Sequence, residues 1–296
     1  MSQPAAYPPA SLGQTEAAGF DIAKLPADFV PPPIPSETRL AADDLIGGLK
    51  RWELWRVLAW QDIRQRYRRS MLGPLWITLS MGVMIGAMGP LYSALFHVPL
   101  ADYLPYLSLG LLIWGLVSTL VTDGCICLTS AEALIKQVRV PLSIHVFRTL
   151  TRNIMIFGHN IVVYIVVALI FRIWPGATGL LVIPGFILLA LNATWIMLLL
   201  GMLCARFRDI GMLIGSLLQV VFFLSPIFWR PEALGNRVIL AEINPVFHFM
   251  QLIRSPLLGQ APSTSNWLVA IGLLIVGWGF TFAFFARFRR RLAYWL

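Results

Sequence analysis

The chain has 296 residues, of which 58% are hydrophobic and only 12% charged, and its mean hydropathy is +0.74. A soluble domain carries about a quarter charged residues, so this composition excludes a water-soluble enzyme and indicates a polytopic membrane protein. The net charge of +9 suggests nucleic acid, but no nucleic-acid motif accompanies it.

Residues 1–42 are rich in proline, and eight of the 20 prolines precede residue 36. This segment has neither the basic start nor the apolar core of a signal peptide. We therefore predict a disordered tail, followed by a membrane domain over residues 70–296.

Between them, residues 43–69 carry apolar side chains at three- and four-residue steps, with arginines on the other faces. This pattern predicts an amphipathic helix in the membrane interface, capped by Asp43 or Asp44. The alternative is a simple juxtamembrane anchor without a further role.

Six apolar stretches are each about long enough to cross a hydrocarbon core of roughly 30 Å. Asp123 is the only formal charge inside any of them, and we expect it to be solvated or paired. The sequence therefore predicts an all-α integral membrane fold with spans at 76–96, 104–128, 153–171, 179–203, 210–229 and 267–285.

The basic residues around these spans are distributed unevenly, with seventeen on one side and four on the other. The positive-inside rule puts the seventeen in the cytoplasm, together with both termini. The basic character of the chain is then mostly a consequence of its topology.

Two connectors between spans have a pattern of their own. Residues 130–141 mix apolar and charged side chains and predict a short cytoplasmic helix, capped by Ser130 and ended by Pro141, although an ordinary connector fits as well. The external residues 230–266 contain short apolar runs broken by prolines, which predicts two short re-entrant helices or a folded surface loop.

Several kinds of chemistry are missing from the chain. None of the three lysines follows a glycine, so no phosphate-binding loop exists and the chain is not a P-loop ATPase. No carboxylate ladder crosses the spans, and the three cysteines have no metal-ligand company. We therefore expect no catalytic residue, no metal site and no cofactor in this chain.

Short motifs add a resemblance to a known family. Residues 58–76 (LAWQDIRQRYRRSMLGPLW) are similar to the sequence that leads into the first span of ABC-2 type permeases that export polysaccharides. Residues 223–229 (FLSPIFW), 243–245 (INP) and 254–259 (RSPLLG) resemble the end of the fifth span and the external loop of the same family. The most similar group is the membrane subunit of O-antigen, capsule and teichoic-acid exporters.

This resemblance implies a homodimer in the bacterial inner membrane, in which each copy pairs with an ATPase subunit that binds ATP and Mg. The cargo would be a polysaccharide linked to undecaprenyl pyrophosphate or another lipid. Residues 43–69 would line the entrance, and the connector at 130–141 would be the coupling helix, with Glu132, Lys136 and Arg139 contacting the ATPase. Asn244, Pro245 and Arg254 would belong to the external gate.

Two sets of side chains suit such a cargo. Basic and aromatic residues before the first span could meet a lipid pyrophosphate, although topology alone would place arginines there: Arg64, Arg66, Tyr67, Arg68 and Arg69. Aromatic rings offer flat faces to sugars, although they also form interfacial belts: Trp76, Tyr92, Tyr106, Trp114 and Trp195.

Two other functions compete with polysaccharide export. An ABC-2 permease for a small hydrophobic compound would have the same architecture. A membrane enzyme of lipid-linked sugars would need acidic or histidine residues clustered at one membrane face, and the external acids are limited to Asp102, Glu232 and Glu242.

Overall fold

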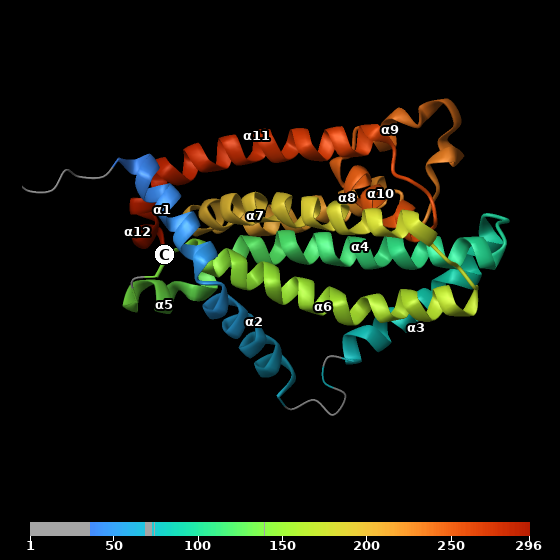
Figure 1. The fold of residues 1–296 in the computed structure, drawn as a ribbon, viewed down its shortest axis with the longest axis horizontal. Helices are drawn as coiled ribbons and strands as arrows, with labels where there is room; N and C mark the ends of the chain where they lie inside the picture. The colour runs from blue at the N-terminus through green and yellow to red at the C-terminus, as the bar shows by residue number, and fades with distance from the viewer. Residues whose placement is uncertain (1–35, 69–72, 74, 139) are drawn as a thin grey trace, which may run out of the picture. The chain divides into compact units, whose positions relative to one another are not determined.

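The computed structural model describes residues 36–68, 73, 75–138 and 140–296. In these parts of the chain every regular element is an α-helix or a 3-10 helix (Figure 1). Most of the predicted tail lies outside the described residues, and the first helix, α1 (Glu37–Lys50), begins before residue 43.

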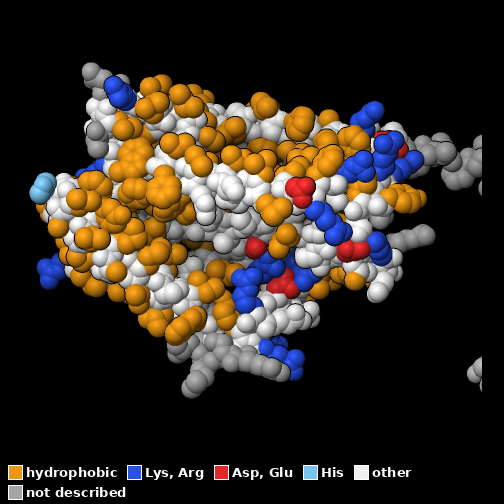
Figure 2. Space-filling model, turned by 180° about the vertical axis from the view of Figure 1, so that it is seen from behind, with side chains coloured by type: hydrophobic (Ala, Val, Ile, Leu, Met, Phe, Trp, Pro, Cys, Tyr) orange, Lys and Arg blue, Asp and Glu red, His pale blue; other side chains and the backbone are white. Residues whose placement is uncertain are grey.

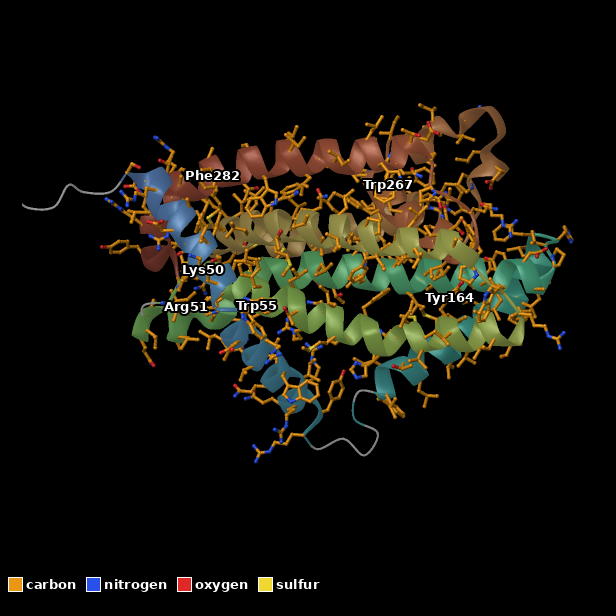
Figure 3. All side chains as sticks on the ribbon, in the orientation of Figure 1. Lys50, Arg51, Trp55, Tyr164, Trp267 and Phe282 are labelled. Carbon is orange, nitrogen blue, oxygen red and sulfur yellow. The ribbon has the colours of Figure 1, made fainter. Side chains whose placement is uncertain are left out.

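The predicted amphipathic helix is two helices, because the chain breaks at Arg51 between α1 and α2 (Trp52–Tyr67). Arg51 has a ψ of 43°, outside the helical range, and Figure 3 shows it beside Lys50 at this junction. The predicted cap at Asp43 or Asp44 is wrong, because the Ser36 hydroxyl accepts the first-turn hydrogen bond instead.

Among the residues that the structure describes, five helical stretches are long and apolar enough to cross a membrane. They correspond to the predicted spans other than 210–229, with most ends shifted by a few residues, but the third begins at Ser143, ten residues before its predicted start. They are α3 (Leu75–Leu95), α4 (Leu100–Ile126), α6 (Ser143–Ile170), the stretch formed by η3 (Gly176–Leu181) with α7 (Val182–Arg206), and α11 (Thr264–Phe288) with η5 (Arg289–Arg291).

The remaining apolar helix, α8 (Ile210–Leu224), has 15 residues and is shorter than the predicted span 210–229. At 1.5 Å per residue it covers about 22 Å, less than the roughly 30 Å of a hydrocarbon core. The helix stops at Leu224 because Pro226 disfavours helical backbone at Ser225, which is extended.

Helix α4 lies at the centre of the bundle and packs against α3, α6 and α7. Its middle is almost completely buried, for example at Leu107, Leu109 and Ile113. By contrast, α3 buries only Ile85 and Gly89, and α8 buries no residue. These two helices therefore present apolar faces without a partner in the described chain.

The bundle has two chemically different ends (Figure 1). We call the end with α1, α5 (Glu132–Gln137) and α12 (Leu292–Trp295) the basic end. We call the opposite end the loop end, because it carries the long connection between α8 and α11. In Figure 2 the acidic side chains of the visible face lie toward the basic end, while hydrophobic side chains cover most of the rest.

Both connectors contain the short helices that the sequence predicts, but with details that differ. Helix α5 follows a 3-10 turn, η2 (Thr129–Ala131), and Ser130 does not cap it, since its hydroxyl donates to Cys127 O. Residues 230–266 contain a kinked 3-10 segment and two helices of unequal length: η4 (Pro231–Arg237), α9 (Ile239–Glu242) and α10 (Pro245–Leu257).

Candidate functional site

A charge network joins three helices at the basic end. Asp62 of α2 accepts hydrogen bonds from Arg148 and Arg152 of α6, and Arg152 also donates to Asp123 of α4 at 2.7 Å. Asn153 adds a bond to the same Asp123 oxygen at 2.9 Å. The Asp and Arg side chains are at most 27% exposed, so water screens these pairs only in part.

This network confirms that Asp123 is paired. Its partners, Arg152 and Asn153, lie on α6, the next membrane-spanning helix. The second carboxylate of the network, Asp62, comes from α2, which precedes the first span. Trp55 of α2, labelled in Figure 3, adds an aromatic contact, with its ring centroid 6.1 Å from that of Phe147 of α6.

Asp44 forms a second junction at the basic end. Its buried carboxylate accepts hydrogen bonds from the backbone N–H groups of Leu142 and Ser143, each at 3.0 Å, and so caps the start of α6 from another helix. Arg289, just after α11, donates two bonds to the same carboxylate. Helix α1 is thereby fixed to both α6 and the end of α11.

The predicted coupling residues lie on the exposed surface of α5. Lys136 Nζ donates to Glu132 at 2.7 Å, and this hydrogen bond lowers the pKa of Glu132. Arg139 lies outside the described residues. Between α1 and α5, a cavity of about 450 Å³ is lined by Asp43, Ile135 and Arg289 among others, so this surface is indented rather than flat.

The predicted lipid-entrance residues lie at the end of α2. Arg64, Arg66 and Arg68 are exposed, and within the described chain none of them has a carboxylate within 4 Å. Tyr67 is half-buried, and Arg69 lies outside the described residues. The structure thus leaves three guanidinium groups free at this position.

At the loop end, residues 225–229 run without regular structure after α8, and side chains of α4 and α10 hold their backbone. Tyr103 OH donates to Phe228 O at 2.6 Å, and Tyr106 OH lies 3.1 Å from Pro226 O. Arg254 Nη1 donates to Pro226 O at 2.7 Å. We call these three side chains together with the backbone of 225–229 the clamp.

Two further residues make the clamp possible. Gly110 of α4 faces it, and a Cβ atom there would lie 2.5 Å from Ile227 O, so only glycine allows this approach. Asn244 caps α10 through Val246 N and donates to Ser225 Oγ at 2.7 Å. The end of α8 and the start of α10 are therefore tied together.

Arg254 is 1% exposed, although the sequence predicted it on an external gate. Its guanidinium carbon lies 4.0 Å from the centroid of the Tyr106 ring, and Gln251 Oε1 accepts from it as well. No carboxylate lies within 4 Å of it in the described chain. Burial lowers the pKa of Arg254, while Tyr106 and Glu232 act in the opposite direction.

Beside Arg254 is a polar cavity of about 170 Å³. It is lined by Asp102, Arg230, Glu232 and Gln251, besides the clamp residues Tyr106 and Arg254. Its two acids and two arginines form no ion pair with one another, as far as the structure describes them. The cavity therefore presents both donors and acceptors without a net charge.

The predicted channel aromatics have different surroundings. Trp76 is exposed on α3, whereas Tyr106 belongs to the clamp. Tyr92 and Trp114 pack against Phe228 and Phe222 near the end of α8. Trp195 instead faces Gly277 of α11 and donates to Asn192. The structure does not bring these five rings into one row.

No metal-ligand cluster of three or more His, Cys, Asp or Glu side chains occurs in the part of the chain that the structure describes. The three cysteines are buried free thiols. The candidate functional features of the described chain are therefore its ion pairs, the clamp and its cavities.

Comparison with known proteins places this arrangement in a family. The model of the ABC-2 type transporter family matches residues 53–258, from α2 to the end of α10, and so covers both the charge network and the clamp. The chain belongs to the ABC-2 type transporter family. With its apolar helices, it is a multi-pass membrane permease, a transport subunit.

The chain is also 23% identical over 197 residues to the O-antigen export system permease protein RfbA of Myxococcus xanthus. The match covers 65% of this chain and 75% of that protein. It confirms the resemblance to polysaccharide export permeases found from the motifs.

Sequence reasoning missed Asp62, Arg148 and Arg152 as site residues. The arginines had been counted only as topological charges. A usable signal was present in the four-residue spacing of Arg148 and Arg152, which places both on one helical face toward an acidic neighbour.

Proposed function

We propose that this chain is the transmembrane subunit of an ABC exporter that moves a lipid-linked polysaccharide, such as an O-antigen, across the bacterial inner membrane. A separate ATPase chain binds ATP and Mg and hydrolyses the nucleotide. The observation that carries this proposal is the similarity to an O-antigen export permease over 197 residues, within a family of transport subunits.

In the proposed topology the chain crosses the membrane six times. Helix α8 and the clamped residues 225–229 together make the fifth crossing, since the clamp satisfies their backbone carbonyls with side-chain donors, as membrane depth demands. The basic end is cytoplasmic in this topology, because seventeen of the basic residues flank the spans at the basic end. The loop end is then external.

The surface around α5 is the proposed docking site for the ATPase. Glu132 and Lys136 are exposed there, and the cavity between α1 and α5 could receive a protruding segment of a partner. Because Asp44 links α1 to α6 and Arg289, a push on α5 or α1 would reach two spans directly. Arg139 belongs to the same proposed surface.

A second copy of the chain is the proposed partner of α3 and α8. Both helices expose large apolar side chains along most of their length, among them Val83, Leu91, Met212 and Phe223. Lipid could cover such faces, but a hydrated glycan needs a path shielded from lipid. Two copies facing each other through α3 and α8 would enclose one.

The polar cavity beside Arg254 favours a glycan over a small hydrophobic compound. A neutral hydroxylated chain can donate to the carboxylates of Asp102 and Glu232 and accept from Arg230, which already donates one bond to Asp102 O. A hydrophobic compound would form none of these hydrogen bonds. At the opposite end, we propose that the lipid pyrophosphate binds to the basic entrance residues Arg64, Arg66, Arg68 and Arg69, with Tyr67.

Loss of the chain from its native cell tests the export proposal. We expect surface polysaccharide to disappear while its lipid-linked form accumulates at the inner membrane, and the wild-type chain to restore export. Unchanged surface glycan, or loss of resistance to a hydrophobic compound instead, would contradict it.

Charge reversal tests the coupling surface separately. The triple variant E132K/K136E/R139E should insert normally but lose export and co-purification of the ATPase. The matched control Arg237→Glu makes the same net change of charge, two units more negative, at an exposed position of the loop end and should still bind the ATPase. Normal export by the first variant would reject α5 as the coupling helix.

A further inference from the structure

The ends of α7 and α11 and the short helix α12 lie together at the basic end (Figure 1). Their side chains line a cavity of about 280 Å³. Its lining combines two arginines with four aromatic rings: Arg206, Phe207, Phe284, Phe288, Arg291 and Trp295. None of these residues belongs to the charge network, the coupling surface or the clamp. The cavity therefore has no role in the function proposed above.

The aromatic side chains form a continuous wall. The ring centroids of Phe284 and Phe288 are 4.7 Å apart, and those of Phe288 and Trp295 are 5.6 Å apart. The guanidinium carbon of Arg206 lies 5.5 Å from the Trp295 ring centroid and 5.6 Å from that of Phe207. Cation–π contacts thus orient one positive charge at the cavity.

The charges of this region are compensated unequally. In the run Arg289–Arg291, the first arginine pairs with Asp44 at 2.8 Å and the second with Glu37 at 3.1 Å. Arg291, like Arg206, has no carboxylate within 4 Å in the described parts of the chain. The two arginines without a counter-ion are the two that line the cavity.

Two like charges beside one small space repel each other, and an anion between them would remove this repulsion. The aromatic wall, however, is a poor environment for a fully hydrated ion such as inorganic phosphate. A ligand that carries both a phosphate and an apolar chain satisfies both parts of the lining. Basic pockets between membrane helices bind lipid head groups in this way.

We propose that this cavity binds the phosphate of an anionic membrane lipid between Arg206 and Arg291, with the lipid chain along Phe284 and Phe288. The bound lipid would supply the counter-ion that Asp44 and Glu37 supply to the neighbouring arginines. It would also hold α12 against the end of α7. The phosphate could come from a bulk phospholipid or from a polyprenyl phosphate.

Native mass spectrometry of the complete transporter, released from lipid nanodiscs, tests this proposal. The probes are phosphatidylglycerol, which is anionic, and phosphatidylcholine, which has no net charge. We expect the wild type to retain phosphatidylglycerol preferentially, and R206Q/R291Q to lose this preference, with about fivefold weaker retention for each arginine removed.

The matched control is R39Q/R208Q, which removes the same charge from exposed positions at the same end outside the cavity lining. It should retain the lipid as the wild type does. Equal loss in both double variants would mean that only general electrostatic attraction operates, and it would overturn the site. Absence of any preference in the wild type would overturn it as well.

If R206Q/R291Q fails to assemble, the single variant Arg291→Gln replaces it, because this exposed side chain makes no hydrogen bond or ion pair within the described chain. Undecaprenyl phosphate then separates the two sources of phosphate. Displacement of phosphatidylglycerol would assign the cavity to polyprenyl phosphates, and continued retention would assign it to phospholipids. Neither result depends on glycan export.

Discussion

At the basic end, carboxylates on α1, α2 and α4 pair with arginines on other helices, whereas at the loop end the buried Arg254 rests on the Tyr106 ring and on uncharged oxygens. The two regions perform a similar task, since each ties a less buried segment to the central bundle. They differ in how much free energy it would cost to separate the attached segment from the bundle.

Ion pairs with partial exposure are weakly directional and can be replaced by water or by another charged partner at small cost. A buried guanidinium that is satisfied by backbone carbonyls has no such substitute, and separation would leave several polar groups unpaired. The charge network around Asp62 is therefore suited to rearrangement when a partner docks, whereas the buried Asp44 keeps α1 fixed. The clamp is suited to keeping residues 225–229 in one geometry.

The largest effect should come from removing the cation of the clamp. Arg254→Ala creates a cavity at a fully buried position and removes the charged donor of Pro226 O and of Gln251 Oε1, which keep only the hydroxyls of Tyr106 and Ser255. We expect the protein to lose about 3 kcal/mol of stability. Thermal unfolding of the purified protein in detergent measures the loss.

The exposed Arg237 at the same end provides the control. Arg237→Ala should leave the unfolding temperature unchanged. If Arg254→Ala is as stable as Arg237→Ala, Arg254 is merely a topological charge, and the contrast between the two ends disappears.

Gly110→Ala should have the next largest effect, because its Cβ would meet the carbonyl of Ile227, which is backbone and cannot turn aside. We expect a loss of about 2 kcal/mol from overpacking, together with reduced export. Gly272→Ala is the control, since no atom lies within 4 Å of a Cβ there. Equal stability of the two variants would show that residues 225–229 approach α4 less closely.

Breaking the charge network should cost less. Asp62→Asn leaves Arg148 without a charged partner, but Arg152 keeps Asp123, so we expect a loss of about 1.5 kcal/mol. Because these pairs are partly screened by salt, the difference from the wild type should shrink at high ionic strength. The loss of stability in Arg254→Ala should not depend on ionic strength, because Arg254 is buried. A salt-independent deficit for Asp62→Asn would show that packing, rather than charge, holds α2.

The sequence was sufficient for the all-helical fold, the multi-pass character and the family, because long apolar runs and short motifs are local signals. It was not sufficient for the break at Arg51 or for the early end of α8. In the second case Pro226 was visible, but a polar gap inside an apolar run does not show whether the helix continues through it.

The candidate sites were less predictable, because they depend on contacts between distant parts of the chain. Asp44 was expected to cap its own helix and instead caps α6, nearly one hundred residues away. Tyr106 was expected in a channel and lies under Arg254. Periodicity places a residue on a helical face, but it does not say which segment covers that face.

The smallest predicted effect compares two properties of one side chain. Asn244 both caps α10 through its Oδ1 and donates from Nδ2 to Ser225. Asn244→Ala should lose about 1 kcal/mol, which is typical of a lost cap. Asn244→Asp keeps the cap acceptor but cannot donate to Ser225 from an ionised carboxylate, so we expect it to be nearly as stable as the wild type but less active in export. If instead Asn244→Asp exports as well as the wild type, the tie between α8 and α10 contributes nothing beyond the cap, and the rigidity of the clamp rests on Arg254 and the tyrosines.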